Sequence, residues 1–269
     1  MSQFVSVRPV RGKEDLRAFL DVPFAIYADD PNWVAPLYIE RLEHLDPQRN
    51  PYFRHAEVEL FLAFRGDKPV GRISAQLCRL RSERHADGVG QFGFLEAEND
   101  PAVFSALFEA AGAWLKQRGA TTIQGPFSFS INDETGLLVE GFDTPPMVLM
   151  GHARPYYGQR MEEAGFAKAK DVFAYDLFAS PEIPRALKSA YDKALSDTDV
   201  TLRPLDKKQL LKELRTVVSI ANDAWSENWG FVPWTEEEMM ALANNLKFLV
   251  SGDYIAIAEY KGEPAAMAI

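Results

Sequence analysis

Cysteine is nearly absent from this sequence of 269 residues, in which Cys78 is the only one. A single thiol excludes an internal disulfide and every zinc cluster that needs several cysteines. This scarcity is typical of a protein that stays in a reducing compartment. We expect Cys78 to be a small core residue rather than a nucleophile.

Long hydrophobic runs are also missing. No window approaches the roughly 18 uninterrupted apolar residues of a membrane-spanning helix. The N-terminal stretch alternates between apolar and polar side chains and lacks the apolar run of a signal peptide. The sequence therefore predicts a cytoplasmic protein without an integral membrane segment.

Positive charge is scarce: 29 Lys and Arg residues stand against 39 Asp and Glu, which gives a net charge of -10 at pH 7. This balance opposes long-range attraction to phosphate backbones and to anionic membrane surfaces. We therefore expect no nucleic-acid partner. An amine substrate, being cationic, is compatible with this charge.

The common catalytic and metal-binding motifs are absent too. The sequence has no HExxH, no paired-cysteine motif, no GxSxG and no GxxxxGKS or GxxxxGKT. Metalloprotease, zinc-finger, α/β-hydrolase and P-loop functions therefore lack a starting set of residues. His55 has no partner at metal-ligand spacing, so we expect it to be structural and expect no metal site. The other histidines, His44, His85 and His152, suggest no catalytic role.

What is present is the composition of a globular protein, with 47% hydrophobic and 25% charged residues, so the chain can bury a core. The elements predicted from periodicity are a strand at 4–9, helices at 13–27 and 37–45, strands at 58–64, 70–80 and 89–97, a helix at 101–118, a strand at 121–129, a helix at 155–164 and a strand at 170–178. Pro23 is expected to kink or split its helix, and 81–88 to be a polar loop.

The helix at 101–118 is the clearest of these elements. Apolar residues recur in it at helical spacing, Asp100 and Pro101 form an N-cap and first-turn pair, and Gly119 ends the run. We expect this helix to pack one face on a sheet.

The sequence repeats itself at an offset of 195 to 196 residues. The matching strings are LRPL at 202–205 with VRPV at 7–10, Asn-Trp at 228–229 with Asn-Trp at 32–33, and the turn at 261–264 with the turn at 65–69. The matches stay collinear, and helices occupy equivalent places between them. We infer a duplicated fold.

The predicted organisation is a complete domain at 1–180, a helical connector at 181–199 and the start of a second domain at 200–269. The second copy stops at Ile269, which corresponds to about Ile73 in the first copy, inside a strand. Half a sheet leaves an apolar face and an unpaired edge exposed. We therefore expect the native protein to continue for roughly another 100 residues.

Four strings carry a resemblance to a known family: YADDPNWVAP at 27–36, NPYFRHAE at 50–57, NDETGLLVEGF at 132–142 and PYY at 155–157. They are similar to a group of bacterial proteins of the GNAT superfamily, labelled N-acetyltransferases, some of whose relatives are N-acyltransferases that build ceramide. The order of elements over residues 3–178 also resembles the GNAT fold. The resemblance implies an α/β (α+β) protein with a mixed, mostly antiparallel sheet flanked by helices, duplicated here with the second copy incomplete.

The resemblance also implies a transferase that uses acyl-CoA or acetyl-CoA as cosubstrate, needs no metal, and acylates an amine such as a sphingoid base or another lipid amine. In a standard GNAT protein, a glycine-containing turn before the long helix binds the CoA pyrophosphate through its amides. The equivalent stretch here, LEAENDPAV at 95–103, has no glycine and carries three carboxylates, which repel a pyrophosphate. The CoA-binding residues of the first copy therefore stay unassigned. Tandem GNAT proteins pair a working copy with a degenerate one, so we expect the second copy to supply the thioester contacts.

Tyr157 is the candidate general acid that the resemblance suggests. Met161 holds the place of the usual GNAT tyrosine, and Tyr156 and Tyr157 lie a turn upstream. We expect Tyr157 to protonate the leaving thiolate and Tyr156 to contact the acceptor. The alternative is that both rings only pack at the start of a helix.

The unusually long segment 132–146 supplies the other polar candidates. Asp133 and Glu134 are expected to hold an ammonium group or, where burial raises their pKa, to deprotonate it, with Asn132 as a further substrate contact. The alternative is an ordinary turn or helix cap, because Asn and Asp are common turn residues.

Trp33 and Trp229 occupy equivalent loops of the two copies. They are candidates for lining an acyl or sphingoid-chain groove, and the alternative is core packing.

The leading hypothesis is therefore an acyl-CoA-dependent N-acyltransferase whose acceptor amine attacks the thioester carbonyl. The contrasting hypothesis is a non-catalytic binding or interaction protein that kept the fold after losing its CoA contacts, which the acidic turn at 95–100 favours. A third hypothesis, a transferase that uses aminoacyl-tRNA, is weakened by the acidic net charge.

Overall fold

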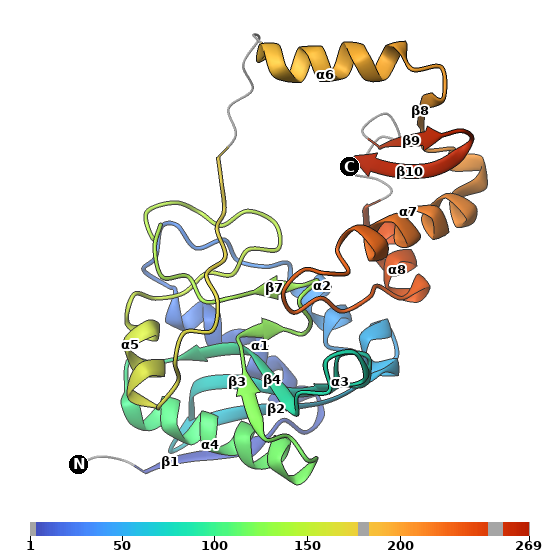
Figure 1. The fold of residues 1–269 in the computed structure, drawn as a ribbon. Coiled ribbons are helices and arrows are strands. Elements are labelled where there is room, and N and C mark those ends of the chain that lie inside the picture. Colours follow the sequence, from blue (N-terminus) through green and yellow to red (C-terminus); the bar gives the residue numbers. More distant parts are fainter. Residues whose placement is uncertain (1–3, 177–182, 247–254, 269) are drawn as a thin grey trace. The chain divides into compact units, whose positions relative to one another are not determined.

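Residues 4–176, 183–246 and 255–268 are described in the computed structural model of the chain. They divide into two compact units, Met1–Asp171 and Val172–Ile269 (Figure 1).

The first unit is built on a five-stranded sheet with the order β1-β2-β3-β4-β5. Its strands are β1 (Val5–Pro9), β2 (Ala56–Arg65), β3 (Lys68–Cys78), β4 (Val89–Ala97) and β5 (Thr122–Gln124). The first three pairings are antiparallel, and β4 pairs with β5 in parallel. The predicted mixed, mostly antiparallel sheet is confirmed, because strands form where apolar side chains alternate or run together.

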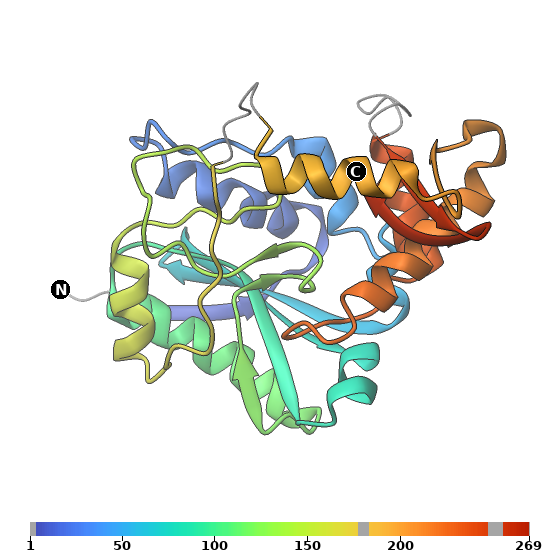
Figure 2. The same cartoon turned by 45° about the horizontal axis from the view of Figure 1, so that its top comes forward.

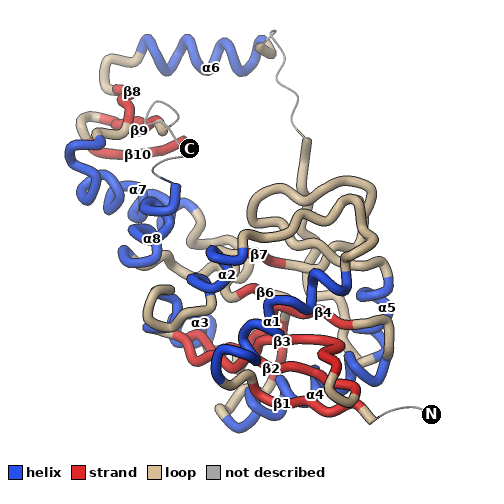
Figure 3. Tube along the Cα trace, turned by 180° about the vertical axis from the view of Figure 1, so that it is seen from behind, coloured by secondary structure: helices blue, strands red, loops and turns tan. Residues whose placement is uncertain are grey.

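Helices cover both faces of this sheet. They are α1 (Gly12–Ile26), α2 (Tyr38–His44), the 3₁₀-helix Pro51–Arg54, α3 (Arg79–His85), α4 (Pro101–Gln117) and α5 (Tyr156–Glu163). α1 lies over β3 and β4, and α4 packs on the opposite face (Figures 2 and 3). Along β3 the side chains alternate accordingly: Arg72 reaches the backbone of α1, whereas Ile73 lies in the core with α4.

α4 has the structure that its sequence predicts. Asp100 accepts a hydrogen bond from the Ala102 amide at 2.9 Å, and Pro101 fills the first helical position. The apolar residues at helical spacing are buried, and they are Val103, Phe104, Leu107, Phe108, Ala111 and Leu115. Burying each large side chain contributes about 1.5–3 kcal/mol, so this face holds α4 on the sheet.

α1 continues through Pro23, which corrects the expectation of a split helix. Proline has no amide hydrogen, so the carbonyl of Phe19, four residues earlier, lacks its helical partner. Arg72 Nη1 donates to this carbonyl at 3.0 Å. A side chain of the sheet thus satisfies the group that the proline leaves free.

Residues 81–88 are not the predicted polar loop, because most of them belong to α3. Cys78 Sγ accepts from the Arg81 amide at 3.4 Å at the helix start, and Ala86 ends the helix in the left-handed region at a φ of 50°. Arg81 is polar in sequence but buried in the fold, where Asp87 binds its guanidinium. Specific side-chain contacts within this segment, which residue polarity alone does not reveal, therefore accompany the helix.

The predicted strand at 121–129 is divided in two. After β5, Gly125 and Pro126 redirect the chain into β6 (Phe127–Ser128), which pairs with β7 (Glu134–Thr135) in a separate two-stranded sheet. The amide of Phe94 in β4 donates to Ser128 Oγ at 3.3 Å, so β6 lies against β4.

The strand predicted at 170–178 is also wrong for the residues that the structure describes. Residues 170–176 are irregular and expose their side chains, and 177–178 lie outside the described residues. A strand needs a hydrogen-bonded neighbour, and sequence alternation alone does not provide one.

Asp87 is expected to stabilise the turn between α3 and β4 in a pH-dependent way. Its carboxylate accepts two hydrogen bonds of 2.8 Å from Arg81 and one of 3.1 Å from the Val89 amide. The Arg81 bonds, together with the Val89 amide, hold the pKa of Asp87 at about 2. A lowered pKa means that this stability is present above the unfolded pKa of about 3.9 and is lost as the pH falls toward 2.

We therefore expect Asp87→Asn to lower the free energy of unfolding by about 1 kcal/mol at pH 7, a value reduced because the side chain is 39% exposed. Urea unfolding at a series of pH values measures the difference, which should vanish in acid. Asp67→Asn, at an exposed turn position, is the control and should change stability by less than about 0.5 kcal/mol. Equal effects of the two changes at pH 7 would contradict the prediction.

The second unit contains a three-stranded antiparallel sheet with the order β10-β9-β8. Its elements are α6 (Arg185–Ser196), β8 (Val200–Pro204), the 3₁₀-helix Lys207–Gln209, α7 (Leu210–Ala224), α8 (Glu236–Leu246), β9 (Ala256–Tyr260) and β10 (Glu263–Ala268). Leu214 and Val217 of α7 pack with Met239 of α8 in its core.

The strand register of the first unit recurs in the second. The paired residues are Val5 with Arg65 and Pro9 with Phe61 in the first unit, and Val200 with Tyr260 and Pro204 with Ala256 in the second. Each position in the second unit follows its counterpart by 195 residues. The register shift that skips Val70 recurs at Ala265. Because register and bulge both repeat, the duplicated fold inferred from the sequence is confirmed.

Candidate functional site

Charged and titratable side chains gather in the first unit on the side of the sheet that α1 covers. They come from β3, β4, α2 and the segment that leads into β7. We call them the acid–base cluster, and its members are Arg41, His44, Arg72, Glu96, Asp133 and Glu134. Charges away from water need partners, so the contacts among these residues decide what the cluster can do.

Glu96 is an enclosed carboxylate at the end of β4. The register of β3 and β4 places it opposite Arg72, whose Nη2 lies 3.8 Å from Glu96 Oε1. The hydroxyl groups of Tyr27 and Tyr157 each donate to Glu96 Oε2 at 2.7 Å. Burial raises the pKa of Glu96 in spite of these partners. Glu96 is therefore a carboxyl group that protonates more readily than an exposed one.

Arg72 is buried between two aromatic rings. Its guanidinium carbon lies 5.0 Å from the ring centroid of Phe19 and 5.8 Å from that of Phe94, within the range of cation–π attraction. Its Nε is buried and has no hydrogen-bond partner among the described residues. Arg72 thus fixes a positive charge beside Glu96.

The second arginine, Arg41 of α2, forms an ion pair with Glu134 at the start of β7. The neighbouring Asp133 closes a turn, in which it accepts hydrogen bonds of 3.1 Å from the amide and the hydroxyl of Ser130. Burial raises the pKa of Asp133. Asp133 therefore combines the position of a turn residue with the raised pKa that proton exchange requires.

His44, the last residue of α2, lies between a carboxylate and an aromatic wall. Its Nδ1 is 3.6 Å from Glu40 Oε1. Its ring centroid is 5.7 Å from that of Phe94 and 5.1 Å from that of Phe129. Nε2 is buried without a partner in the described part of the chain.

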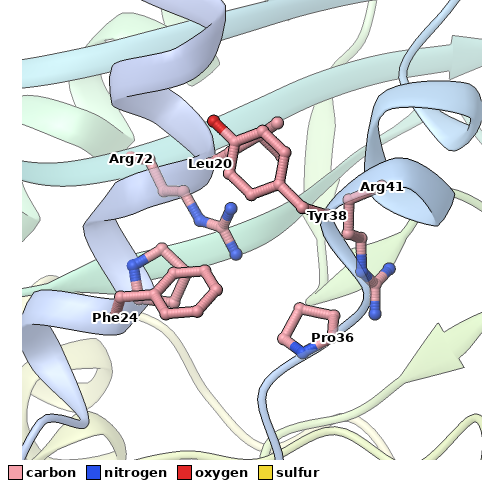
Figure 4. Close-up of a pocket in the computed structure, with 7 residues that line it drawn as sticks. Leu20, Phe24, Pro36, Tyr38, Arg41 and Arg72 are labelled. Atoms are coloured by element: carbon pink, nitrogen blue, oxygen red, sulfur yellow. The ribbon is translucent and has the colours of Figure 1, made fainter.

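A small cavity of about 10 Å³, enough for one water molecule, adjoins the two arginines. Figure 4 shows Arg72 on one side of it and Arg41 on the other, with Tyr38 between them. The residues lining it are Leu20, Pro23, Phe24, Pro36, Tyr38, Arg41 and Arg72. The cavity is thus part of the cluster and too small for a substrate.

The predicted site residues of the first unit fall in or beside the cluster. Tyr157 is buried, donates to Glu96 and accepts from the Ala97 amide at 3.0 Å, while Tyr156 donates to the Ala97 carbonyl at 2.7 Å. Asn132 lies in the turn of Asp133, where its amide donates to Ser130 Oγ at 3.0 Å. Tyr156 and Tyr157 therefore lie at the end of β4, and Asn132 lies in the turn that carries Asp133.

The two predicted tryptophans have different settings. Trp33 stacks on Tyr27 with ring centroids 5.2 Å apart and meets Phe24 edge-on at 5.1 Å. Tyr27 connects Trp33 to Glu96. Trp229 belongs to the second unit and is 40% exposed.

Sequence reasoning missed Arg41, His44, Arg72 and Tyr27, and assigned Glu96 only a repulsive role. One signal was available for Arg72, a charged residue inside the apolar run Val70 to Ile73 of a predicted strand. Its partner Glu96 follows only from the register of β3 and β4.

The first turn of α4 does not fit a pyrophosphate. Pro101 has no amide hydrogen, Ala102 donates to the Asp100 carboxylate, and Val103 donates to the Asp100 carbonyl. Arg65 is held by Glu98 at 2.9 Å and by Asp100 at 2.6 Å. The amides that would bind an anion at this helix start are therefore already used.

Two kinds of site are missing from the described residues. No group of three or more His, Cys, Asp or Glu side chains is arranged there to hold a metal ion. None of the helices within those residues is both long and apolar enough to cross a membrane.

No family model matches the chain. It is 48% identical over 268 residues to a bacterial ceramide synthase of Caulobacter vibrioides (strain NA1000 / CB15N), a match that covers 98% of this chain and 69% of that protein. It is 43% identical over 268 residues to the protein YghO of Escherichia coli (strain K12), covering 98% and 67%. Among solved structures, a tandem GNAT protein from the clavulanic acid biosynthesis pathway has a similar fold, with a TM-score of 0.51 and 11% identity over 98% of this chain and 73% of that one. The last likeness concerns the fold alone.

Proposed function

The chain belongs to the family of the bacterial ceramide synthase and has a tandem GNAT fold, and on this premise we propose that it transfers an acyl group from acyl-CoA to an amine. The observation that carries the proposal is 48% identity over 98% of the chain. A ceramide is the amide of a fatty acid and a sphingoid base. We therefore propose a lipid amine of the sphingoid type as acceptor.

The acid–base cluster supports an amine acceptor. An ammonium group binds where carboxylates are enclosed, and Asp133 and Glu134 provide two of them beside Asn132. Burial raises the pKa of Asp133 and of Glu96, which moves both toward the range in which a carboxylate exchanges protons. We propose that Asp133 and Glu134 hold the amine and that Asn132 contacts its polar end.

Tyr157 receives a different role from the one its sequence position suggested. Its hydroxyl hydrogen is donated to Glu96 and its oxygen accepts from Ala97, while burial raises its pKa well above the usual value. Such a group is a poor acid for a leaving thiolate. We propose that Tyr157 positions Glu96. We propose that Tyr156 and Trp33 line the acceptor-binding side, and that Trp229 has the equivalent role in the second copy.

The donor is proposed to bind through the second copy. This follows from the first turn of α4, whose amides do not fit a pyrophosphate.

The proposed domains remain 1–180 and 200–269 with a connector at 181–199, and the proposed location is cytoplasmic.

We expect the protein to form one amide and release one thiol from palmitoyl-CoA and a long-chain 2-amino alcohol. Mass spectrometry detects the amide, and a thiol reagent follows the release. Cys78 is the only cysteine and is buried, so it contributes little background. The control is the same acceptor with its nitrogen already acetylated, which should give no product because it lacks the nucleophile.

A non-catalytic binding protein is the second candidate, and the occupied helix start at α4 favours it. Thermal shift separates the two candidates, because a ligand that binds only the folded state raises its melting temperature. Stabilisation by the amine without thiol release would replace the transferase proposal with this one.

A further inference from the structure

His44 belongs to α2, where Glu40 stands one turn before it on the same face of the helix. The carbonyl of His44 accepts from Asn50 Nδ2 at 2.7 Å, which fixes the end of the helix. The backbone beneath the imidazole is therefore held independently of the ring.

The ring itself is enclosed, and one of its nitrogens is unused. Phe94 and Phe129 line it, with centroids 5.7 Å and 5.1 Å away. Nε2 is buried without a hydrogen-bond partner among the described residues. Leaving a buried polar group unsatisfied costs about 1–3 kcal/mol, so a ligand that hydrogen-bonds to Nε2 would remove this cost.

The surrounding charges favour one position for the imidazole hydrogen. Glu40, 3.6 Å from Nδ1, favours the hydrogen on that nitrogen, which leaves the lone pair on Nε2. Asp133 interacts electrostatically with His44 from the segment before β7, and the charge of Arg41 is paired with Glu134. Nε2 is therefore a proton acceptor in the electrostatic neighbourhood of Asp133, one of the two carboxylates proposed to hold the amine.

We propose that His44 is the general base of the acyl transfer and that Glu40 is its positioning residue. This proposal rests on the acyltransferase function proposed above. The ammonium group first loses one proton to solvent; the neutral amine then attacks the thioester carbonyl, a C–N bond forms, and Nε2 takes one N–H proton. When the tetrahedral intermediate collapses, the C–S bond breaks and the proton passes from Nε2 to the thiolate, so that amine and thioester become amide and thiol.

A second buried histidine provides a matched control. His152 Nε2 lies 3.0 Å from Asp30 Oδ2, and its Nδ1 is also buried without a partner within the described ranges. Its ring packs on Tyr27, and Arg154 shares its carboxylate at 3.6 Å. The His152 side chain is 5% exposed against 14% for His44 and also has a carboxylate partner, so it controls for the loss of a largely enclosed imidazole.

The test compares His44→Ala with His152→Ala in the thiol-release assay, with and without added imidazole. We expect His44→Ala to lower kcat by about 10²–10³-fold with little change in KM, as loss of a general base does. Added imidazole should raise the kcat of His44→Ala at least about tenfold. This rescue should grow as the pH rises, because a larger fraction of the imidazole is then neutral. His152→Ala should keep its rate within about threefold and gain nothing from imidazole.

Glu40→Gln covers the case in which His44→Ala does not fold. Glu40 is 47% exposed, so the change is tolerated, and we expect a loss of about tenfold in kcat at unchanged KM. Full activity of His44→Ala, equal rescue of both histidine variants, or full activity of Glu40→Gln would each overturn the proposal while leaving the transferase function intact. Absence of thiol release in the unchanged protein would overturn both.

Discussion

Replacing Arg72 with methionine is expected to lower the free energy of unfolding by about 3–5 kcal/mol at pH 7, because removing one partner of a buried ion pair leaves the other charge uncompensated. Arg72 is 8% exposed, and the other groups that hold its partner Glu96 among the described residues are the hydroxyls of Tyr27 and Tyr157. The change also removes the donor to the Phe19 carbonyl that Pro23 leaves free. Urea unfolding followed by circular dichroism measures the loss.

The pH dependence of this loss has a definite sign. Burial raises the pKa of Glu96, and a carboxyl group with a raised pKa in the folded state costs stability above its unfolded pKa. The cost disappears as the pH falls and the group takes up a proton. The deficit of Arg72→Met should therefore be largest at neutral pH and should shrink in acid.

Two further variants separate the ion pair from simple loss of volume. Adding Glu96→Gln to Arg72→Met should recover more than about 1 kcal/mol, because no buried charge is then left alone. Arg17→Met, at an α1 side chain that is 80% exposed, should change stability by less than about 0.5 kcal/mol. If the double variant is no more stable than Arg72→Met, the ion pair is not the cause.

Gly93→Ala is the second change with a large expected effect. A Cβ atom at this position would lie 1.7 Å from the carbonyl oxygen of Phe127 and 2.4 Å from its carbonyl carbon. Both are backbone atoms, so β6 must move away from β4 to admit a methyl group. We expect a loss of about 3 kcal/mol or more, at the upper end of the range for overpacking.

Gly112→Ala is the matched control for this change. Gly112 lies inside α4, and a Cβ there meets nothing within 4 Å. Alanine is the better helix former, so the variant should gain about 0.5–1 kcal/mol. Melting temperatures of the two variants should therefore move in opposite directions, and a tolerated Gly93→Ala would show that β6 is not pressed against β4.

The close contact at Gly93 also affects the site. β6 leads directly into Phe129, whose ring stacks on Tyr52 at 5.1 Å and lines His44. Ser128 Oγ accepts from the amide of Phe94, which sits in the left-handed region at a φ of 47°. The wall around the imidazole therefore depends on the packing of β6, and Gly93 makes that packing possible.

The sequence by itself determined strands β1 to β4, the long helix with its Asp100 cap, the duplication and the family. These depend on local periodicity, on capping residues and on collinear strings, all of which can be read along one dimension. The same local patterns gave wrong predictions at 81–88 and at 121–129. In the first segment the buried Arg81 binds Asp87, and in the second β6 is hydrogen-bonded to β4. Polarity and alternation do not contain those contacts.

Only the tertiary structure decided which charged residues meet. Asp133 and Glu134 were found from sequence because they stand in a long polar segment. Arg72 and Glu96 are partners because antiparallel register places them opposite each other, and a shift of one residue would turn either side chain to the other face. His44 contacts the rings of Phe94 and Phe129 because the fold brings α2, β4 and the end of β6 together. Residue types and their spacing are properties of the chain, whereas the enclosure that changes a pKa or leaves a nitrogen without a partner is a property of the fold.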